Sequence, residues 1–269
     1  MDLGLGGKIA LVTGSSKGIG AAVAQGLARE GATVIVHGRD PALARGVAEK
    51  IKQAGGSAHV VTGDLTEATQ VDAMLDMARS FAGDIDILVN NAGGSSAGSD
   101  WSTTEPTAWA STYDANVLAA VRIAKAVLPP MRHARWGRII NISSLAGLMP
   151  PAVNPDYSAA KAAMLTMSVS MAKAVAAEGV TVNTVSPGTI HSEKLDGKFR
   201  EVAQTKGIAL DAPWDEVEAA VLPLFAQVPV GRVGTLQEIA DAVAFLASPR
   251  ASYITGSNLR LDGGMLPTI

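Results

Sequence analysis

The chain has 269 residues, of which 48% are hydrophobic and 17% are charged, and its formal net charge is −3. This length suits one sizeable α/β domain, and the near-neutral charge gives no basic surface for nucleic acid or for an anionic membrane. Cysteine is absent, and the histidines lack metal-ligand spacing, so we expect neither disulfides nor a metal site. There is no signal-peptide pattern, and no apolar run approaches the roughly 20 residues of a membrane helix. We therefore expect a cytoplasmic protein.

The first 40 residues have the pattern of a βαβ unit with a glycine-rich turn. An apolar run at 8–12 leads into T-G-S-S-K-G-I-G, and a helical pattern ends at Gly31 before a β-branched strand at 33–37. Glycines let backbone N–H groups approach a pyrophosphate, and the helix N-terminus favours its charge. The spacing G-x-x-x-G-x-G differs from the general fingerprint, and such a turn can exist without a ligand. The strand–turn–helix context of Gly14, Gly18 and Gly20 nevertheless favours a dinucleotide site.

The end of the second strand lacks the acid that the dinucleotide fingerprint expects at the adenosine ribose. His37, Gly38 and Arg39 stand there instead, and the next pair, Asp40-Pro41, is typical of a helix N-cap followed by proline at N1. Arg39 and Lys17 are therefore free to bind a 2′-phosphate, although each alone could be a solvated surface cation. Their joint position favours NADP(H) as the cofactor, with NAD(H) possible.

Strand and helix patterns continue to alternate along the chain. Helical patterns at about 41–54, 67–82, 105–114, from 116 onwards, 156–178 and 235–247 separate strand patterns at 57–61, 85–89, 137–144, 180–185 and 258–262. The sequence therefore predicts a single-domain Rossmann fold over residues 1–269, a doubly wound parallel sheet of about seven strands with helices on both faces.

Small and polar residues follow several strands, at the edge where an open parallel sheet binds its ligand. They are Asp64-Leu65, the segment N-N-A-G-G at 90–94, the pair Ser143 and Ser144, and S-P-G-T-I at 186–190. Asp64 could accept a hydrogen bond from an adenine amino group, or it could cap the helix that begins near Thr66. Asn116 is unfavourable inside a helix, where it could bind a structural water or bend the helix.

Ser144, Tyr157 and Lys161 have the spacing of a proton-transfer site. Tyr157 and Lys161 are four residues apart, so a helix places them on one face, one turn from each other. The unperturbed pKa of tyrosine is about 10, and a nearby cation lowers that pKa towards the range of acid–base chemistry. The hydroxyl of Ser144, thirteen residues before Tyr157, could orient a substrate oxygen beside the phenol.

Two further segments predict an assembly surface and a lid. The helix at 156–178 is small and apolar on nearly every face, so one side can cover the sheet while the other packs against another subunit. We therefore expect a homo-oligomer, either a tetramer or a dimer. Residues 191–234 contain weak helical patterns at about 194–206 and 214–226, interrupted by prolines. Such an insertion at the ligand edge is typical of a lid or specificity element, which we place at about 190–230.

With these motifs assembled, the chain resembles the short-chain dehydrogenase/reductase family over residues 8–264. T-G-S-S-K-G-I-G, N-N-A-G, Asn116, Ser144, Y-S-A-A-K and S-P-G-T match the motifs of that family in order and in approximate spacing. Tyr-x-x-x-Lys alone is unspecific, but all six motifs in order make coincidence implausible. Within the family, the chain is most similar to the 3-oxoacyl carrier-protein reductase-like branch.

The resemblance implies a catalytic tetrad of Asn116, Ser144, Tyr157 and Lys161, with Ser143 as a less suitable substitute for Ser144. Tyr157 would donate the proton in carbonyl reduction, Lys161 would lower its pKa and bind the nicotinamide ribose, and Asn116 would hold a water. Beside Tyr157, Lys161 and Arg39, the implied cofactor contacts are Gly14, Ser16, Lys17, Gly18, Ile19, Gly20, Asp64, Leu65, Asn91, Ala92, Gly93, Pro187, Gly188 and Thr189.

The predicted activity is NADP-dependent reduction of a ketone, a 3-oxoacyl or other carbonyl substrate, to a secondary alcohol by hydride transfer. One alternative is an NAD-dependent alcohol, sugar or steroid dehydrogenase that works in the oxidative direction, and Lys17 and Arg39 disfavour it. The other is a non-catalytic NADP-binding regulator, which the complete tetrad disfavours.

The substrate is less determined by the sequence, because each candidate contact could equally be ordinary packing. The candidate substrate contacts are Ser95, Trp101, Met149, Val153 and His191. A phosphopantetheine-linked substrate would need cations near the mouth of the site, and four cations of the predicted lid could supply them or only solvate a helix. These cations are Lys194, Lys198, Arg200 and Lys206.

Overall fold

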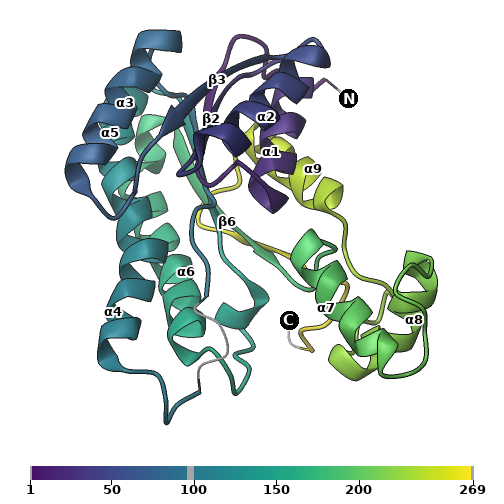
Figure 1. Ribbon diagram of the computed structural model, residues 1–269. Helices are drawn as coiled ribbons and strands as arrows, with labels where there is room; N and C mark the ends of the chain where they lie inside the picture. The colour runs from purple at the N-terminus through teal and green to yellow at the C-terminus, as the bar shows by residue number, and fades with distance from the viewer. Residues whose placement is uncertain (1, 96–99, 268–269) are drawn as a thin grey trace.

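A seven-stranded parallel sheet forms the centre of the computed structural model, which describes residues 2–95 and 100–267 (Figure 1). Its strands are β1 (Ile9–Val12), β2 (Thr33–Gly38), β3 (Ser57–Thr62), β4 (Ile87–Asn90), β5 (Gly137–Ile142), β6 (Val180–Pro187) and β7 (Asn258–Leu261). They are ordered β3-β2-β1-β4-β5-β6-β7. The order reverses between β1 and β4, and open parallel sheets bind ligands beside such a switch point. The predicted Rossmann sheet is therefore confirmed.

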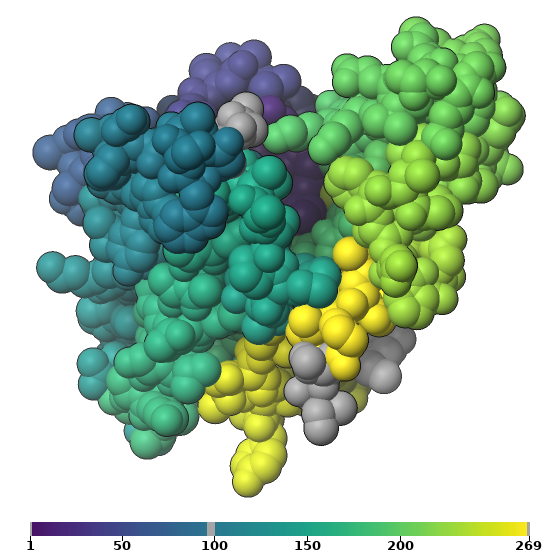
Figure 2. All heavy atoms as spheres, turned by 90° about the horizontal axis from the view of Figure 1, so that it is seen from below, coloured from purple at the N-terminus to yellow at the C-terminus, as the bar shows by residue number. Residues whose placement is uncertain are grey.

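Two helices stand apart from the sheet and form a small unit of their own. α7 (Glu193–Gln204) and α8 (Trp214–Phe225) pack on each other around the fully buried Phe199 and Val217 (Figure 1). We call residues 191–234 the lid unit. Figure 2 shows the surface hollowed between this light-green unit and the teal part of the chain, with purple N-terminal atoms at the floor of the hollow.

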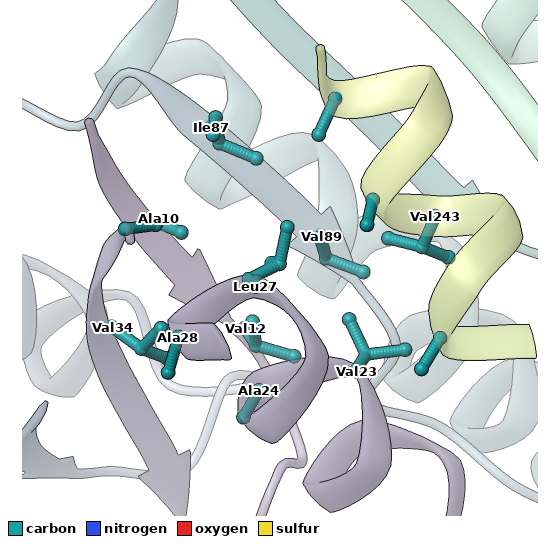
Figure 3. Close-up of a cluster of buried hydrophobic side chains, with 14 of the residues drawn as sticks. Ala10, Val12, Val23, Ala24, Leu27, Ala28, Val34, Ile87, Val89 and Val243 are labelled. Atoms are coloured by element: carbon teal, nitrogen blue, oxygen red, sulfur yellow. The ribbon is translucent and has the colours of Figure 1, made fainter. Parts of the chain in front are cut away.

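The first face of the sheet is covered by α1 (Gly18–Arg29), α2 (Pro41–Gln53) and α9 (Leu236–Ala247). Ala10 and Val12 of β1 point to this face, because alternate residues of a strand point the same way. Figure 3 shows Leu27 of α1 and Val243 of α9 packed over them and over the neighbouring strands.

The opposite face is covered by α3 (Ala68–Ala82), α5 (Ala119–Ala134) and α6 (Pro155–Val175). Leu11 and Leu88 point to this second core, whereas their neighbours in the same strands point to the first. The strands are thus apolar on both sides, as expected for parallel strands between two helical layers. In the part of the chain that the structure describes, no helix is both long and apolar enough to span a membrane.

One long helical stretch replaces the two separate helices predicted before β5. α4 (Pro106–Tyr113) continues through a π-helical turn, Asp114–Leu118, into α5. Asn116 lies in this turn and is fully buried. Kinks in helices commonly occur at π turns, so this turn is compatible with a bend, which is one of the two roles that the sequence left open for Asn116. Residues 96–99, part of the polar loop expected before α4, lie outside the described residues.

The boundaries around β3 and β4 correct two predictions. α3 begins at Ala68 with Glu67 at its N-cap position, so Asp64 does not cap that helix. Instead, its Oδ1 accepts hydrogen bonds from the backbone N–H and the hydroxyl of Thr66, at 2.9 Å and 2.8 Å. Asn90 belongs to β4, where its Nδ2 donates to Oδ1 of Asn141 on β5 at 2.8 Å. Only Asn91 of the asparagine pair therefore faces the edge of the sheet.

Candidate active site

Two cavities lie at the carboxyl end of the sheet. The first has a volume of about 390 Å³ and is lined by the turn between β1 and α1 and by the ends of β2, β3 and β4. The second has a volume of about 440 Å³ and lies between the ends of β5 and β6, Tyr157 and the lid unit. We call them the glycine-turn cavity and the tyrosine cavity.

The turn between β1 and α1 has the geometry of a phosphate cradle. Gly14 has a φ of +61°, and a Cβ on it would lie 2.9 Å from Cα of Ala92, so only glycine fits this close approach. A Cβ at Gly18 would meet no atom within 4 Å, which shows that the start of α1 faces open space. Lys17 occupies the N-cap without a side-chain hydrogen bond, and the first turn has no acidic residue. The exposed positive end of the helix dipole is thus suited to an anionic ligand.

Side chains from neighbouring strands fix this turn in place. Nδ2 of Asn91 donates to the carbonyl oxygens of Thr13 and Gly14 at 2.9 Å and 3.0 Å. Oγ1 of Thr13 accepts from the backbone N–H groups of Asn91 and Ala92, both at 3.0 Å. His37 also binds the turn, a contact that the sequence reasoning missed because His37 was considered only as the absence of an acid. The sequence does contain an indication of this contact, because a histidine at the end of a buried strand needs partners for both ring nitrogens.

The charged groups of the glycine-turn cavity agree with the prediction of a 2′-phosphate site. Arg39 and Lys17 are both exposed and line the cavity together with Ser16. Asp64 lines it too, and the hydrogen bonds from Thr66 hold the pKa of its carboxyl below the ordinary value. This carboxylate therefore remains a hydrogen-bond acceptor, as the predicted contact with an adenine amino group requires. The remaining predicted contacts on this wall are Leu65, Ala92 and Gly93.

Tyr157, Ser144 and Ser143 line the tyrosine cavity together, as the spacing in the sequence predicts. Oγ of Ser143 donates to the backbone carbonyl of Lys161 at 2.8 Å, so this hydroxyl ties β5 to α6. Ser144 caps the short helical turn Leu145–Gly147 and forms a hydrogen bond with the phenol of Tyr157. The arrangement thus favours Ser144 over Ser143 as the group beside the phenol.

Lys161 is buried below Tyr157 on the same face of α6. Its Nζ donates to the carbonyl of Ile142 at 2.9 Å and lies 5.6 Å from the centroid of the Tyr157 ring. Burial lowers the pKa of Lys161 to about 8. The predicted Tyr–Lys face is therefore present, with an ammonium group that is easily deprotonated.

The electrostatics of Tyr157 differ from the expectation that Lys161 lowers its pKa. Burial raises the pKa of Tyr157 above its ordinary value, and the hydrogen bond from Ser144 offsets only part of this rise. The ammonium of Lys161 donates to the backbone of β5, and among the described residues it forms no hydrogen bond with the phenol oxygen of Tyr157. Near neutral pH the phenol is consequently held in its protonated, proton-donating form.

Asn116, the fourth predicted tetrad residue, joins the π turn to the segment after β4 that carries Gly93 and Gly94. Its Oδ1 accepts from the N–H of Gly94 at 3.1 Å, and its Nδ2 donates to the carbonyls of Gly94 and Thr112, both at 2.9 Å. A Cβ on Gly93 would collide with the Asn116 side chain. The structure therefore shows a positioning contact, and the predicted water stays a prediction.

The predicted contacts at the nicotinamide end are brought together around the tyrosine cavity. Gly188 donates its N–H to the carbonyl of Leu261 at 2.9 Å, which holds the segment after β6 against β7. The end of β6, the segment after it and the start of α1 line the cavity together with Tyr157. The predicted residues there are Ile19, Pro187, Gly188 and Thr189.

None of the predicted substrate contacts lies among the described residues that line the tyrosine cavity. Trp101 is 73% exposed and packs on Trp109, and His191 stacks on Trp214 with ring centroids 3.8 Å apart. The other three, Ser95, Met149 and Val153, are exposed. The cavity wall on this side comes instead from the lid unit, and its residues are Ser192, Lys194, Leu195, Lys198 and Phe225.

The structure separates the four candidate cations of the lid unit. Arg200 is bound to Asp196 at 2.6 Å and to the carbonyls of Leu210 and Ala212, so it is a structural group. Lys194 and Lys198 are exposed and line the tyrosine cavity, whereas Lys206 does not line it.

Comparisons with known proteins give matches over nearly the whole chain. A family model described as short chain dehydrogenase matches residues 8–202. The chain is 41% identical over 263 residues to the 3-oxoacyl-[acyl-carrier-protein] reductase FabG of Vibrio cholerae, covering 98% of this chain and 99% of that protein. L-sorbose reductase from Gluconobacter frateurii, solved with NADPH and L-sorbose, is 34% identical with a TM-score of 0.91, and all of both chains is covered. A structure of a gluconate dehydrogenase, described as putative, from Agrobacterium tumefaciens is 29% identical over the full length of both chains, with a TM-score of 0.87.

Proposed function

Because the chain belongs to the short-chain dehydrogenase/reductase family, we propose that it is an NADP-dependent reductase that converts a ketone to a secondary alcohol. The observation that carries this proposal is the position of Tyr157, whose phenol is hydrogen-bonded to Ser144 and lines a cavity at the carboxyl edge of the sheet. A relative of known structure that shares the whole fold was solved with NADPH.

The glycine-turn cavity fits the adenosine half of NADP(H). The backbone of Gly14, Gly18 and α1 would hold the pyrophosphate, while Arg39 and Lys17 would bind the 2′-phosphate. NADPH supplies the hydride when it is bound. The protein contributes orientation, exclusion of water and the proton.

In the tyrosine cavity, Ser144 would orient the carbonyl oxygen of the substrate and Tyr157 would protonate that oxygen. Lys161, whose ammonium lies 5.6 Å from the centroid of the Tyr157 ring, would offset part of the cost that burial imposes on the remaining phenolate, without bringing the pKa of the phenol below its ordinary value. Asn116 keeps the Gly93-Gly94 segment and the π turn in register, and it would also hold the water that returns a proton.

The substrate class is supported by the relatives and by the lid unit. The relatives include a 3-oxoacyl-[acyl-carrier-protein] reductase and an L-sorbose reductase. The substrates in both names contain a ketone. Leu195 and Phe225 give the cavity an apolar wall, and Lys194 and Lys198 add two cations. These features favour a ketone with an apolar part and an anionic group, such as a 3-oxoacyl thioester carried on phosphopantetheine. The lid unit would close over this substrate as a specificity element.

The test is NADPH consumption with a panel of 3-oxoacyl thioesters, free ketones and ketose sugars. Tyr157→Phe should lower turnover by about 10²- to 10⁴-fold, because it removes the proton donor, while NADPH binding is retained. Tyr253→Phe is the matched control, since Tyr253 is fully exposed. Full turnover by Tyr157→Phe would show that another group donates the proton.

A homo-oligomer, a dimer or a tetramer, belongs to the same proposal. Large apolar side chains of α4, the π turn, α5 and α6 are partly exposed, and contiguous exposed apolar surface commonly marks an association site. Their exposed fractions are 43% for Tyr113, 40% for Leu118, 38% for Val121 and 38% for Val169.

A further inference from the structure

His37 connects three segments of the glycine-turn cavity. It lies at the end of β2, is 2% exposed, and its Nδ1 accepts the backbone N–H of Gly14 at 3.0 Å. On the other side of the ring, Nε2 lies 3.1 Å from the carbonyl oxygen of Gly63, at the end of β3. Its backbone N–H and carbonyl bind Ser15, which belongs to the same turn.

These partners permit only one protonation state of the imidazole. A backbone N–H can only donate, so Nδ1 must carry a lone pair, and a carbonyl can only accept, so Nε2 must carry the proton. The contacts therefore specify the neutral Nε2–H tautomer. In an imidazolium, an N–H on Nδ1 would face the N–H of Gly14, and one of the two groups would have to move.

The surroundings of His37 also favour the neutral imidazole. Burial, the largest effect, lowers the pKa of His37, and the cation Arg39 lowers it further. The hydrogen bond to Gly63 and the carboxylate of Asp64 oppose this effect but do not reverse it. Among the described residues of the cavity wall, the one other charged group is Lys17, on the glycine turn.

Movement of Gly14 would alter the cradle directly. Gly14 packs against Ala92 so closely that a single methyl group would not fit, and its carbonyl is bound by Asn91. The turn, the end of β2 with Arg39 and the end of β3 with Asp64 are all walls of one cavity. A change at Nδ1 would therefore be transmitted to the groups that would hold the pyrophosphate, the 2′-phosphate and the adenine of the cofactor.

We propose that His37 is a positioning residue of the cofactor site, and that NADP(H) binds to the protein in which its imidazole is neutral. This inference rests on the proposed cofactor function of the glycine-turn cavity. Protonation of His37 and cofactor binding then exclude each other, so mild acid releases the cofactor. The residue acts through Gly14 and contacts no reacting atom.

The experiment measures the Kd for NADPH between pH 5 and pH 8 for the wild type, His37→Asn, His37→Leu and His59→Asn. Asparagine can place its Oδ1 near the position of Nδ1 and does not titrate, whereas leucine removes both hydrogen bonds. His59→Asn is the matched control, because His59 lies on the neighbouring strand β3 and stacks on Phe81. The 2′-phosphate of NADPH itself titrates near pH 6 and contributes its own pH dependence to the Kd. All four proteins are therefore compared with the same ligand, so that this contribution is common to them.

In the wild type and His59→Asn, affinity should fall about tenfold for each pH unit below the pKa of His37. His37→Asn should lose this dependence and keep only the slope due to the phosphate. His37→Leu should bind NADPH at least about tenfold more weakly at pH 8, with the loss in the KM for NADPH rather than in kcat.

Two results would overturn the inference: a pH dependence of His37→Asn equal to that of the wild type, or tighter binding by the wild type in acid than by His37→Asn. The second would mean that an imidazolium assists phosphate binding. If His37→Leu does not fold, the comparison of the wild type with His37→Asn still decides. No binding of NADPH by the wild type at pH 8 would refute the proposed cofactor function itself, and this inference with it.

Discussion

Burial sets the protonation states of the three titratable groups that line or support the site. It keeps the phenol of Tyr157 protonated, weakens the hold of Lys161 on its proton and disfavours a charge on His37. In each case the charged form loses hydration that the protein only partly replaces. A site built in this way can donate a proton near neutral pH and is sensitive to pH on both sides of neutrality.

The alkaline limit of the reaction should follow Lys161. Its pKa is lowered to about 8, so the ammonium is present below this pH and is lost above it, while Tyr157, with a raised pKa, keeps its proton. At saturating NADPH, we therefore expect kcat/KM for the ketone to be level from pH 6.5 to 7.5 and to decline above about pH 8. Lys173→Met, at the exposed end of the same helix, should keep this profile, whereas Lys161→Met should be impaired at every pH. A rise in rate from pH 8 to pH 10 would contradict this role.

Arg39 should determine the choice between the two nicotinamide cofactors. A charge-assisted hydrogen bond is worth roughly 1.5–3 kcal/mol, so Arg39→Ala should reduce kcat/KM for NADPH by about 10- to 100-fold and leave that for NADH nearly unchanged. Arg45→Ala, exposed on α2, serves as the control. Equal efficiency of the wild type with NADPH and NADH would refute the assignment.

At the scale of elements, α6 both carries residues of the candidate active site and packs against the π turn. Its N-terminal turns carry Tyr157 and Lys161, and the next turns place Met164 and Met167 against Val117 of the π turn. The same π turn holds Asn116. The positions of three predicted tetrad residues, Asn116, Tyr157 and Lys161, therefore depend on one packed contact between α6 and the π turn.

A charge in that contact should impair catalysis without changing any tetrad residue. Met167→Glu places an unpaired carboxylate in a partly buried apolar cluster, so we expect a loss of about 2 kcal/mol in the free energy of unfolding. Turnover should fall with it at temperatures where the variant remains folded. Ala174→Glu introduces the same charge at an exposed position of α6 and should have little effect on either quantity. Unchanged turnover and stability in Met167→Glu would show that the contact does not support the site.

For the whole molecule, the strand order explains why residues so far apart in sequence form one site. The sheet order places the ends of β1, β2, β3 and β4 around the glycine-turn cavity, and the ends of β5 and β6 beside Tyr157. The two ends of the lid unit come together at an isolated β-bridge between Ile190 and Gly234, outside the seven strands of the sheet. The lid unit is thus connected to the rest of the chain at two adjacent points, beside the edge that it would cover.

The proposed assembly gives a test at this scale. Val169 is 38% exposed on the outer side of α6, so Val169→Asp would bury a charge if this surface packs against another subunit. We expect a lower mass by light scattering and an unchanged circular dichroism spectrum. Leu43→Asp is the control, because Leu43 is also exposed, at 49%, but lies on α2. A wild type that is monomeric, or a variant of unchanged mass, would exclude this surface as the interface.

The sequence by itself determined the Rossmann sheet, the order of the elements and the positions of Gly14, Ser144, Tyr157 and Lys161. These features depend on local patterns: the period of apolar residues, glycine at a tight turn, and the four-residue spacing along a helix. Such signals need no knowledge of distant contacts.

Only the tertiary structure decided which groups meet and in which ionic form. It showed Ser143 bonded to the backbone of α6, Arg200 neutralised by Asp196, and His191 stacked within the lid unit. It also replaced a tyrosine pKa lowered by lysine with one raised by burial, and it gave His37 two partners from distant segments. Hydrogen-bond partners and burial depend on residues far apart in the chain, so no local pattern could contain them.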